Sequence, residues 1–125
     1  MRRLLFAFAA TPVAAVLIAA PASAAMTVGA FVTRASVLRA NPLTAIASPD
    51  FATLRSEAQA AAAQLKAERE ARRAAGKPPI ACPPAGQSIG MLEMLDGLAA
   101  LPAADQRLPL KDGYAKVIAR RFPCR

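Results

Sequence analysis

The sequence predicts an all-α fold: a small bundle of about four helices with one disulfide, after a cleaved N-terminal signal helix. Apolar side chains recur every three or four residues in several segments beyond residue 25, and Ser, Thr, Asn, Gly or Pro bounds these segments. No stretch alternates apolar and polar residues as a half-buried strand does. About 100 of the 125 residues follow the N-terminal apolar segment, which is enough for one small domain.

Residues 1–24 have the pattern of a secretory signal peptide. Two arginines precede an uncharged apolar stretch over 4–20, and Ala22 and Ala24 stand at the −3 and −1 positions for cleavage after Ala24. We therefore expect a single helical domain over 25–125 in a periplasmic or secreted product.

A retained membrane anchor is the alternative to cleavage. Thr11 and Pro12 interrupt the apolar stretch, and a peptidase-compatible site rather than a basic flank follows it. We expect no stable membrane anchor.

The chain is basic, with 16 Lys and Arg against 8 Asp and Glu. Most of these charges are expected to form a solvated surface. An exported chain with no aromatic residues between its basic ones is a poor nucleic-acid binder, because bases need a stacking platform. We expect a protein partner and no nucleic acid.

A first helix is predicted over 27–40, where Thr27 can cap the N-terminus. Asn41-Pro42 ends this helix and starts a short helical turn that carries Leu43 and Ile46. The predicted apolar face of the first helix consists of Val28, Phe31, Val32, Ala35 and Leu38.

A second, longer helix is predicted to begin at Ser48-Pro49, because Ser is a good cap and Pro at the first helical position loses no hydrogen bond. Gly76 and Pro78-Pro79 end it. Its packing seam, spaced by three and four residues, is Phe51, Leu54, Ala58, Ala61 and Leu65.

The second half of this helix, over 66–73, has only charged residues and alanine. A helix over 49–75 measures about 40 Å, whereas a 100-residue domain has a radius of gyration of only about 13 Å. We therefore expect the charged end to overhang the core as a solvated helix tip. The alternative is a basic docking arm.

Four prolines make 77–85 an extended connector. A third helix is predicted over 88–98 and a last helix from Pro109 to just before Pro123, with a loop between them. The apolar surface predicted for the third helix is Ile89, Met91, Leu92, Met94, Leu95 and Leu98. That of the last helix is Leu110, Tyr114, Val117 and Ile118.

Cys82 and Cys124 are the two cysteines of the chain. Export places both in an oxidising compartment, where an even count indicates a disulfide. A redox-active pair is the alternative, but such pairs favour Cys-X-X-Cys spacing at a helix start. We expect a structural bridge between the connector and the C-terminus.

The residue types needed for catalysis are scarce. The chain has no His, which excludes a Ser-His triad and a Cys-His pair and leaves no credible zinc site. Glu93 and Asp96 share a face of the third helix but are expected to be solvated, and Tyr114 is expected in the core. We predict a protein that is not an enzyme and holds no cofactor.

The second half of the chain, over about 80–124, resembles the Rap/Tai family of small periplasmic immunity proteins. The shared motifs are Cys-Pro-Pro-Ala-Gly-Gln-Ser over 82–88, Leu-Pro at 108–109 and Phe-Pro-Cys at 122–124. Members of that family are helical, pair these cysteines, and bind and block peptidoglycan-cleaving amidase effectors of the type VI secretion system. The resemblance implies the same fold and a secreted amidase toxin as the partner.

In a protein of this type, the connection between the last two helices is the element free to enter a partner's cleft. It covers 102–107 here, and its candidate partner-binding residues are Pro102, Asp105 and Arg107. The alternative function is a periplasmic holdase-like or envelope-stress protein, and a third reading is a structural component of the envelope. The partner, the oligomeric state and the binding face are left open by the sequence.

Overall fold

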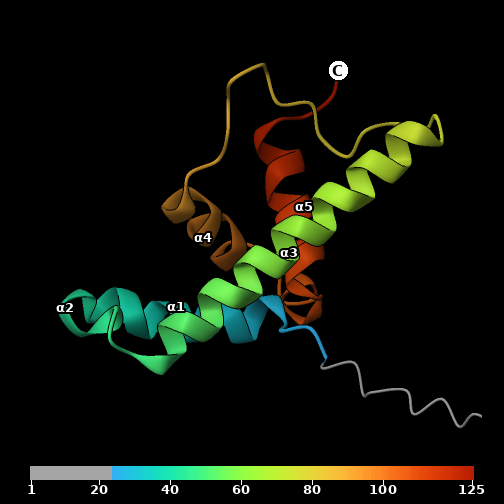
Figure 1. Ribbon diagram of the computed structural model, residues 1–125. Coiled ribbons are helices and arrows are strands. Elements are labelled where there is room, and N and C mark those ends of the chain that lie inside the picture. The colour runs from blue at the N-terminus through green and yellow to red at the C-terminus, as the bar shows by residue number, and fades with distance from the viewer. Residues whose placement is uncertain (1–23) are drawn as a thin grey trace, which may run out of the picture.

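The computed structural model of the protein describes residues 24–125, and this part of the chain is helical (Figure 1). The predicted all-α bundle with one disulfide is confirmed for these residues. The predicted signal segment lies outside them, except for Ala24, so the expected cleavage site at Ala22 and Ala24 stays a prediction. In chain order the elements are α1 (Val28–Ala40), α2 (Pro42–Ala45), α3 (Pro49–Ala74), α4 (Met91–Ala99), the 3-10 helix η1 (Asp105–Arg107) and α5 (Leu110–Arg121).

Local side-chain chemistry sets the starts of the two longest helices. The Thr27 hydroxyl accepts a hydrogen bond from the Ala30 amide (3.2 Å), and the Ser48 hydroxyl accepts one from the Asp50 amide (3.2 Å). Pro49 occupies the first turn of α3, where a missing N–H has no cost. The predicted starts of both helices are therefore confirmed.

The end of α3 is closed by a Schellman motif. Gly76 has a φ of 68°, its amide donates to the Arg73 carbonyl (3.1 Å), and the Lys77 amide donates to the Arg72 carbonyl (2.9 Å). Glycine adopts this left-handed conformation without steric cost, so the chain can turn back sharply at this point.

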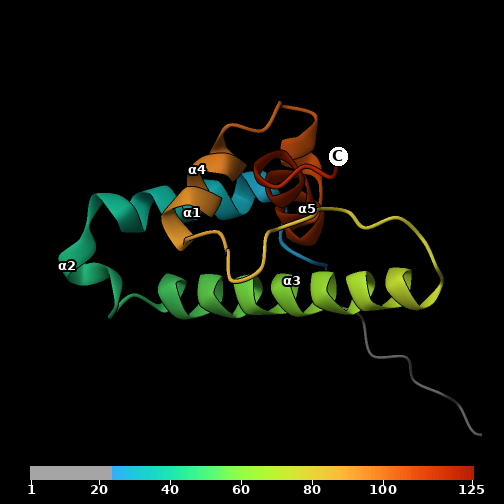
Figure 2. The ribbon, with the colours of Figure 1, turned by 90° about the horizontal axis from the view of Figure 1, so that it is seen from above.

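The helices form two layers. Helix α3 forms one layer. Helices α1, α4 and α5 form the second layer, which covers one side of α3 (Figure 2). The deepest part of the core is where the start of α1, the end of α4 and the start of α5 meet, because Val28, Leu98 and Leu110 have 2% exposure or less. Leu54 and Leu65 of α3 and Val117 of α5 are also buried, as their spacing predicts.

Two glycines allow α5 to approach its neighbours closely. A Cβ atom at Gly113 would overlap with Val28 and touch Leu98, and a Cβ atom at Gly97 would overlap with Val117. The absence of these side chains lets α5 cross α1 and α4 at close range.

Helix α4 begins later than the sequence predicts. It starts at Met91 with Gly90 as an extended N-cap (φ −74°, ψ 159°), and not at Ser88. Glycine has a low helix propensity, and Gly90 supplies the first carbonyl of the helix, to which the Met94 amide donates (2.9 Å).

The predicted apolar surface of α4 is correspondingly wrong at its first turn. Met94 and Leu98 are buried, but Met91 and Leu92 are 84% and 60% exposed. A short helix that packs on neighbours along one stripe leaves the side chains of its free end in solvent.

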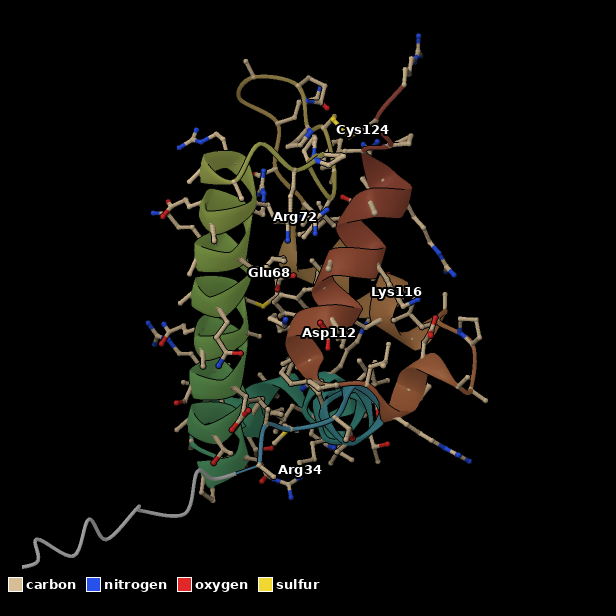
Figure 3. All side chains as sticks on the ribbon, turned by 90° about the vertical axis from the view of Figure 1, so that its right-hand side faces the viewer. Arg34, Glu68, Arg72, Asp112, Lys116 and Cys124 are labelled. Atoms are coloured by element: carbon tan, nitrogen blue, oxygen red, sulfur yellow. A yellow bond between two sulfur atoms is a disulfide. The ribbon has the colours of Figure 1, made fainter. Side chains whose placement is uncertain are left out.

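The charged half of α3 is only partly solvated. Most of its side chains are exposed, but Glu68 and Arg72 point toward α5 and the connector (Figure 3). The Lys111 ammonium donates to the Glu68 carboxylate (2.6 Å), and the Arg72 guanidinium donates to the Pro78 carbonyl (2.9 and 3.1 Å). These contacts attach this half of the helix to the rest of the domain along one side.

Candidate functional site

The loop between α4 and α5 projects from the body of the domain. In Figures 2 and 3 it lies on the side of the molecule away from α3. Leu101 and Leu110 at its two ends are buried, whereas Pro102, Ala103 and Ala104 at its tip are exposed. The loop is thus anchored by apolar side chains and presents small, compact residues to the outside.

Gln106 holds the loop from within. Its side-chain amide donates to the carbonyl of Leu98 (2.9 Å) in the last turn of α4 and to the carbonyl of Leu101 (3.0 Å) just after the helix. Neither carbonyl has an amide partner four residues on, because the helix ends there, although the Leu98 carbonyl also accepts from the Leu101 amide (3.2 Å). Sequence reasoning missed Gln106, since a glutamine in a loop carries no signal that distinguishes a capping side chain from a solvated one.

The segment before α1 secures the far side of the loop. The Val28 amide donates to the Leu108 carbonyl (2.9 Å), and the Leu110 amide donates to the Met26 carbonyl (3.0 Å). Thr27 and Pro109 form an isolated antiparallel bridge between these two segments. Residues 80 or more positions apart in the sequence therefore share hydrogen bonds, which the sequence patterns do not predict.

The three residues that the sequence singles out differ in their surroundings. Pro102 and Arg107 are exposed. The Asp105 side chain is only 20% exposed and lies 3.4 Å from the Lys116 ammonium of α5. The loop thus presents Pro102 and Arg107 to solvent, while Asp105 takes part in fixing the loop to α5.

The disulfide closes the opposite end of α5. Cys82 and Cys124 form the disulfide, and the Cys82 amide donates to the Phe122 carbonyl (2.9 Å). The side chain of Phe122 is buried. Figure 1 shows the C-terminus at one end of α5 and the loop at the other. Both ends of the α4–α5 pair are therefore held, one by covalent chemistry and one by hydrogen bonds.

The acidic residues of α4 connect helices. Asp96 pairs with Arg39 of α1 (2.6 Å), and Glu93 pairs with Arg121 of α5 (2.7 Å). All four side chains are about half exposed or more, so each pair contributes at most about 1 kcal/mol to stability. These carboxylates link α4 to its neighbours α1 and α5.

Two titratable groups of α5 have perturbed pKa values. Burial raises the pKa of the Tyr114 hydroxyl, and hydrogen bonds to Glu68 and then to Asp112 raise the pKa of the Lys111 ammonium. Both groups stay protonated at neutral pH, because both shifts are upward.

None of the helices in residues 24–125 is long and apolar enough to span a bilayer. No three His, Cys, Asp or Glu residues of this part lie close enough together to hold a metal ion.

Comparison of the chain with models of protein families, with curated proteins and with solved structures found no match.

Proposed function

We propose that the protein is an exported protein-binding module of immunity type, which binds and blocks a periplasmic protein such as a peptidoglycan amidase effector. The observation that supports this proposal is the loop between α4 and α5, which projects from the domain while it is anchored on both sides. The resemblance of residues 80–124 to Rap/Tai immunity proteins motivates the choice of partner.

A loop of this kind suits inhibition. Its backbone is held before binding, so little conformational entropy is lost when it enters a cleft. Pro102, Ala103 and Ala104 are compact and uncharged, and Arg107 adds one exposed cation beside them. A stable complex needs roughly 1,000 Å² of buried surface, so the flanking faces of α4 and α5 must contribute.

Co-purification from a periplasmic extract tests the proposal. The double variant Ala103→Glu/Arg107→Glu changes only exposed side chains and leaves the Gln106 anchor in place. The matched control Ala52→Glu/Arg55→Glu makes the same two exchanges at exposed positions of α3. We expect one stoichiometric partner that the wild type and the control retain and the loop variant loses. Equal retention by both variants, or the absence of a stoichiometric partner, would contradict the proposal.

A holdase-like function is the second candidate, and a different observation favours it. Five large apolar side chains are 59–98% exposed, and they belong to the end of α1, to α2 and the residue after it, and to the start of α4: Val37, Leu43, Ile46, Met91 and Leu92. Large apolar side chains that remain exposed are candidates for contacts with other proteins when they form a continuous patch.

The two functions differ in what they bind. A holdase suppresses aggregation of many unfolded clients, and Leu43→Ser/Ile46→Ser should abolish that suppression while the loop variant leaves it intact. Light scattering of a reduced, aggregating client protein measures this. No effect of the wild-type protein on scattering would exclude the holdase.

A further inference from the structure

A basic groove lies between the C-terminal half of α3 and the connector that returns from it. The groove is open and has a volume of about 550 Å³. Its charged lining consists of five cations and one carboxylate: Lys66, Arg69, Arg72, Arg73, Lys77 and Glu70. We call this surface the α3 groove. It is distinct from the loop between α4 and α5, so the inference below does not depend on the proposed function.

The spacing of the cations aligns them along the groove. Lys66, Arg69 and Arg73 follow one another at intervals of three and four residues, so they share one face of α3. Lys77 continues the row just after the Schellman turn. Cations in the last turn of a helix are favoured by its dipole, but Lys66 and Arg69 lie too far from that turn for this reason alone.

The groove cations lack acidic partners within the domain. The ion pairs of the described residues use Glu68 and Asp112 for Lys111, Asp96 for Arg39, Glu93 for Arg121 and Asp105 for Lys116. None of these pairs includes a cation of the α3 groove. The basic excess of the chain is therefore concentrated where it is not neutralised.

The groove is also held in shape. The Arg72 guanidinium donates to the Pro78 carbonyl through Nε (3.1 Å) and Nη2 (2.9 Å), which fixes the connector to the helix. The disulfide and the hydrogen bond from the Cys82 amide to Phe122 hold the other end of the connector (Figure 3). A preformed surface of this kind loses little entropy on binding.

We propose that the α3 groove binds an extended, acidic segment of a protein partner. The row from Lys66 to Arg73 rises about 10 Å along the helix, which an extended peptide covers with about three to four residues. Carboxylates on such a segment can therefore meet successive cations of the row. The groove has no aromatic side chain in its lining, so it offers no stacking platform for nucleic-acid bases.

A membrane surface is disfavoured for a related reason. Peripheral helices that bind anionic lipid combine basic residues with large apolar ones that enter the interface. The exposed large apolar side chains of the described residues lie on α1, α4 and around α2, and none lies on α3.

Fluorescence anisotropy with a labelled peptide of five glutamates tests the proposal, with the five-glutamine peptide as the uncharged probe. We expect the glutamate peptide to bind at low salt and to lose affinity as salt screens the charges. Arg69→Gln/Arg73→Gln should weaken binding by about tenfold, because each exposed ion pair is worth up to roughly a factor of five. The matched control Arg34→Gln/Arg55→Gln removes the same charge from exposed positions outside the groove and should weaken binding less than about twofold.

Equal weakening by both double variants would show that only the net charge matters and would overturn the proposal. Failure of the glutamate peptide to bind the wild type would overturn it as well. Sedimentation with phosphatidylglycerol vesicles tests an anionic membrane as the other source of negative charge. The choice of an acidic peptide would be overturned if vesicle binding depended on Arg69 and Arg73 as strongly as peptide binding does. Circular dichroism melting of each variant checks that the fold is unchanged, and Arg69→Gln alone serves if the double variant melts early.

Discussion

Single polar side chains determine how the projecting loop is held. Gln106 satisfies two carbonyls at the end of α4, and Asp105 pairs with Lys116 of α5. The residues at the tip make no comparable contacts and remain exposed. The loop thus separates anchoring residues from residues available to a partner, although all of them lie within six positions of the sequence.

Gln106→Ala should lower the free energy of unfolding by roughly 1–3 kcal/mol, because it leaves the Leu101 carbonyl without its donor and removes one of the two donors to the Leu98 carbonyl. Chemical denaturation followed by circular dichroism measures the change. Gln87→Ala, at an exposed position of the connector, is the control and should change stability by less than about 0.5 kcal/mol. Equal stability of the two variants would show that Gln106 does not hold the loop.

Tyr114 makes the free energy of unfolding fall as the pH becomes alkaline. Burial raises its pKa in the folded state above the ordinary value of about 10, so the folded protein holds this proton more tightly than the unfolded chain. The contribution of Tyr114 to stability is complete below the pKa that this group has in the unfolded chain. It is lost as the pH rises through the higher pKa of the folded state. Lys111 acts in the same direction, because its pKa is also raised.

Tyr114→Phe should therefore lose less stability than the wild type between pH 8 and about 11, since one of the two groups no longer titrates. Denaturant titrations at a series of pH values measure this dependence. Parallel pH profiles for the two proteins would refute the assignment.

At the scale of elements, the close crossing of α5 over α1 and α4 organises the core. Gly113 and Gly97 permit that crossing, and Val28, Leu98 and Leu110 fill the space around it. The start of α1 therefore packs against the start of α5, and the loop before α5 lies over the N-terminus of α1.

Gly113→Ala should destabilise the domain by about 1–3 kcal/mol, because the added methyl group overlaps with Val28 and no neighbouring space receives it. In an exposed helix the same exchange would stabilise. Val28→Ala removes the methyl groups with which the new Cβ collides, so the double variant should be more stable than the sum of the two single effects predicts. Strict additivity, measured by denaturation, would indicate that Gly113 does not set the crossing.

At the scale of the whole molecule, the domain is closed at two places. The disulfide joins the connector to the C-terminus, and the segment before α1 pairs with the segment before α5. The connector, α4 and the loop are thus tied down at both ends of α5, which explains how a domain with so short a fourth helix keeps its loop and its groove in fixed positions.

Removal of the disulfide in Cys82→Ser/Cys124→Ser should cost about 2–4 kcal/mol, because the bridge spans 42 positions and restricts the unfolded chain. A loss of that size lowers the melting temperature by roughly 10 °C or more, at about 4–8 °C per kcal/mol. Reductant should have the same effect on the wild type and none on the double variant. Identical melting of the wild type with and without reductant would show that the bridge contributes nothing.

The sequence by itself determined the class of fold, the starts of the longest helices and the pairing of the cysteines. The helix starts and ends depend on local chemistry: Thr27 and Ser48 reach amides two or three residues away, and Gly76 turns the chain where its own backbone allows it. The pairing of the cysteines follows from their number, because the chain has two. It also determined which side chains of α3 are buried, because the helical period alone places Leu54 and Leu65 on one face.

Only the tertiary structure decided which side chains of α4 are buried, how the loop is held against α1 and α5, and where the unpaired cations gather. The Met26 carbonyl accepts from the Leu110 amide, which becomes its neighbour only after the helices pack, and Glu68 faces Lys111 across 43 positions of sequence. The periodic pattern predicts Met91 and Leu92 on the packed surface of α4, but both are exposed. Such a pattern does not reveal which end of a helix has a neighbour. Hydrogen bonds and burial between distant segments depend on the packing of the whole chain, and no local pattern encodes them.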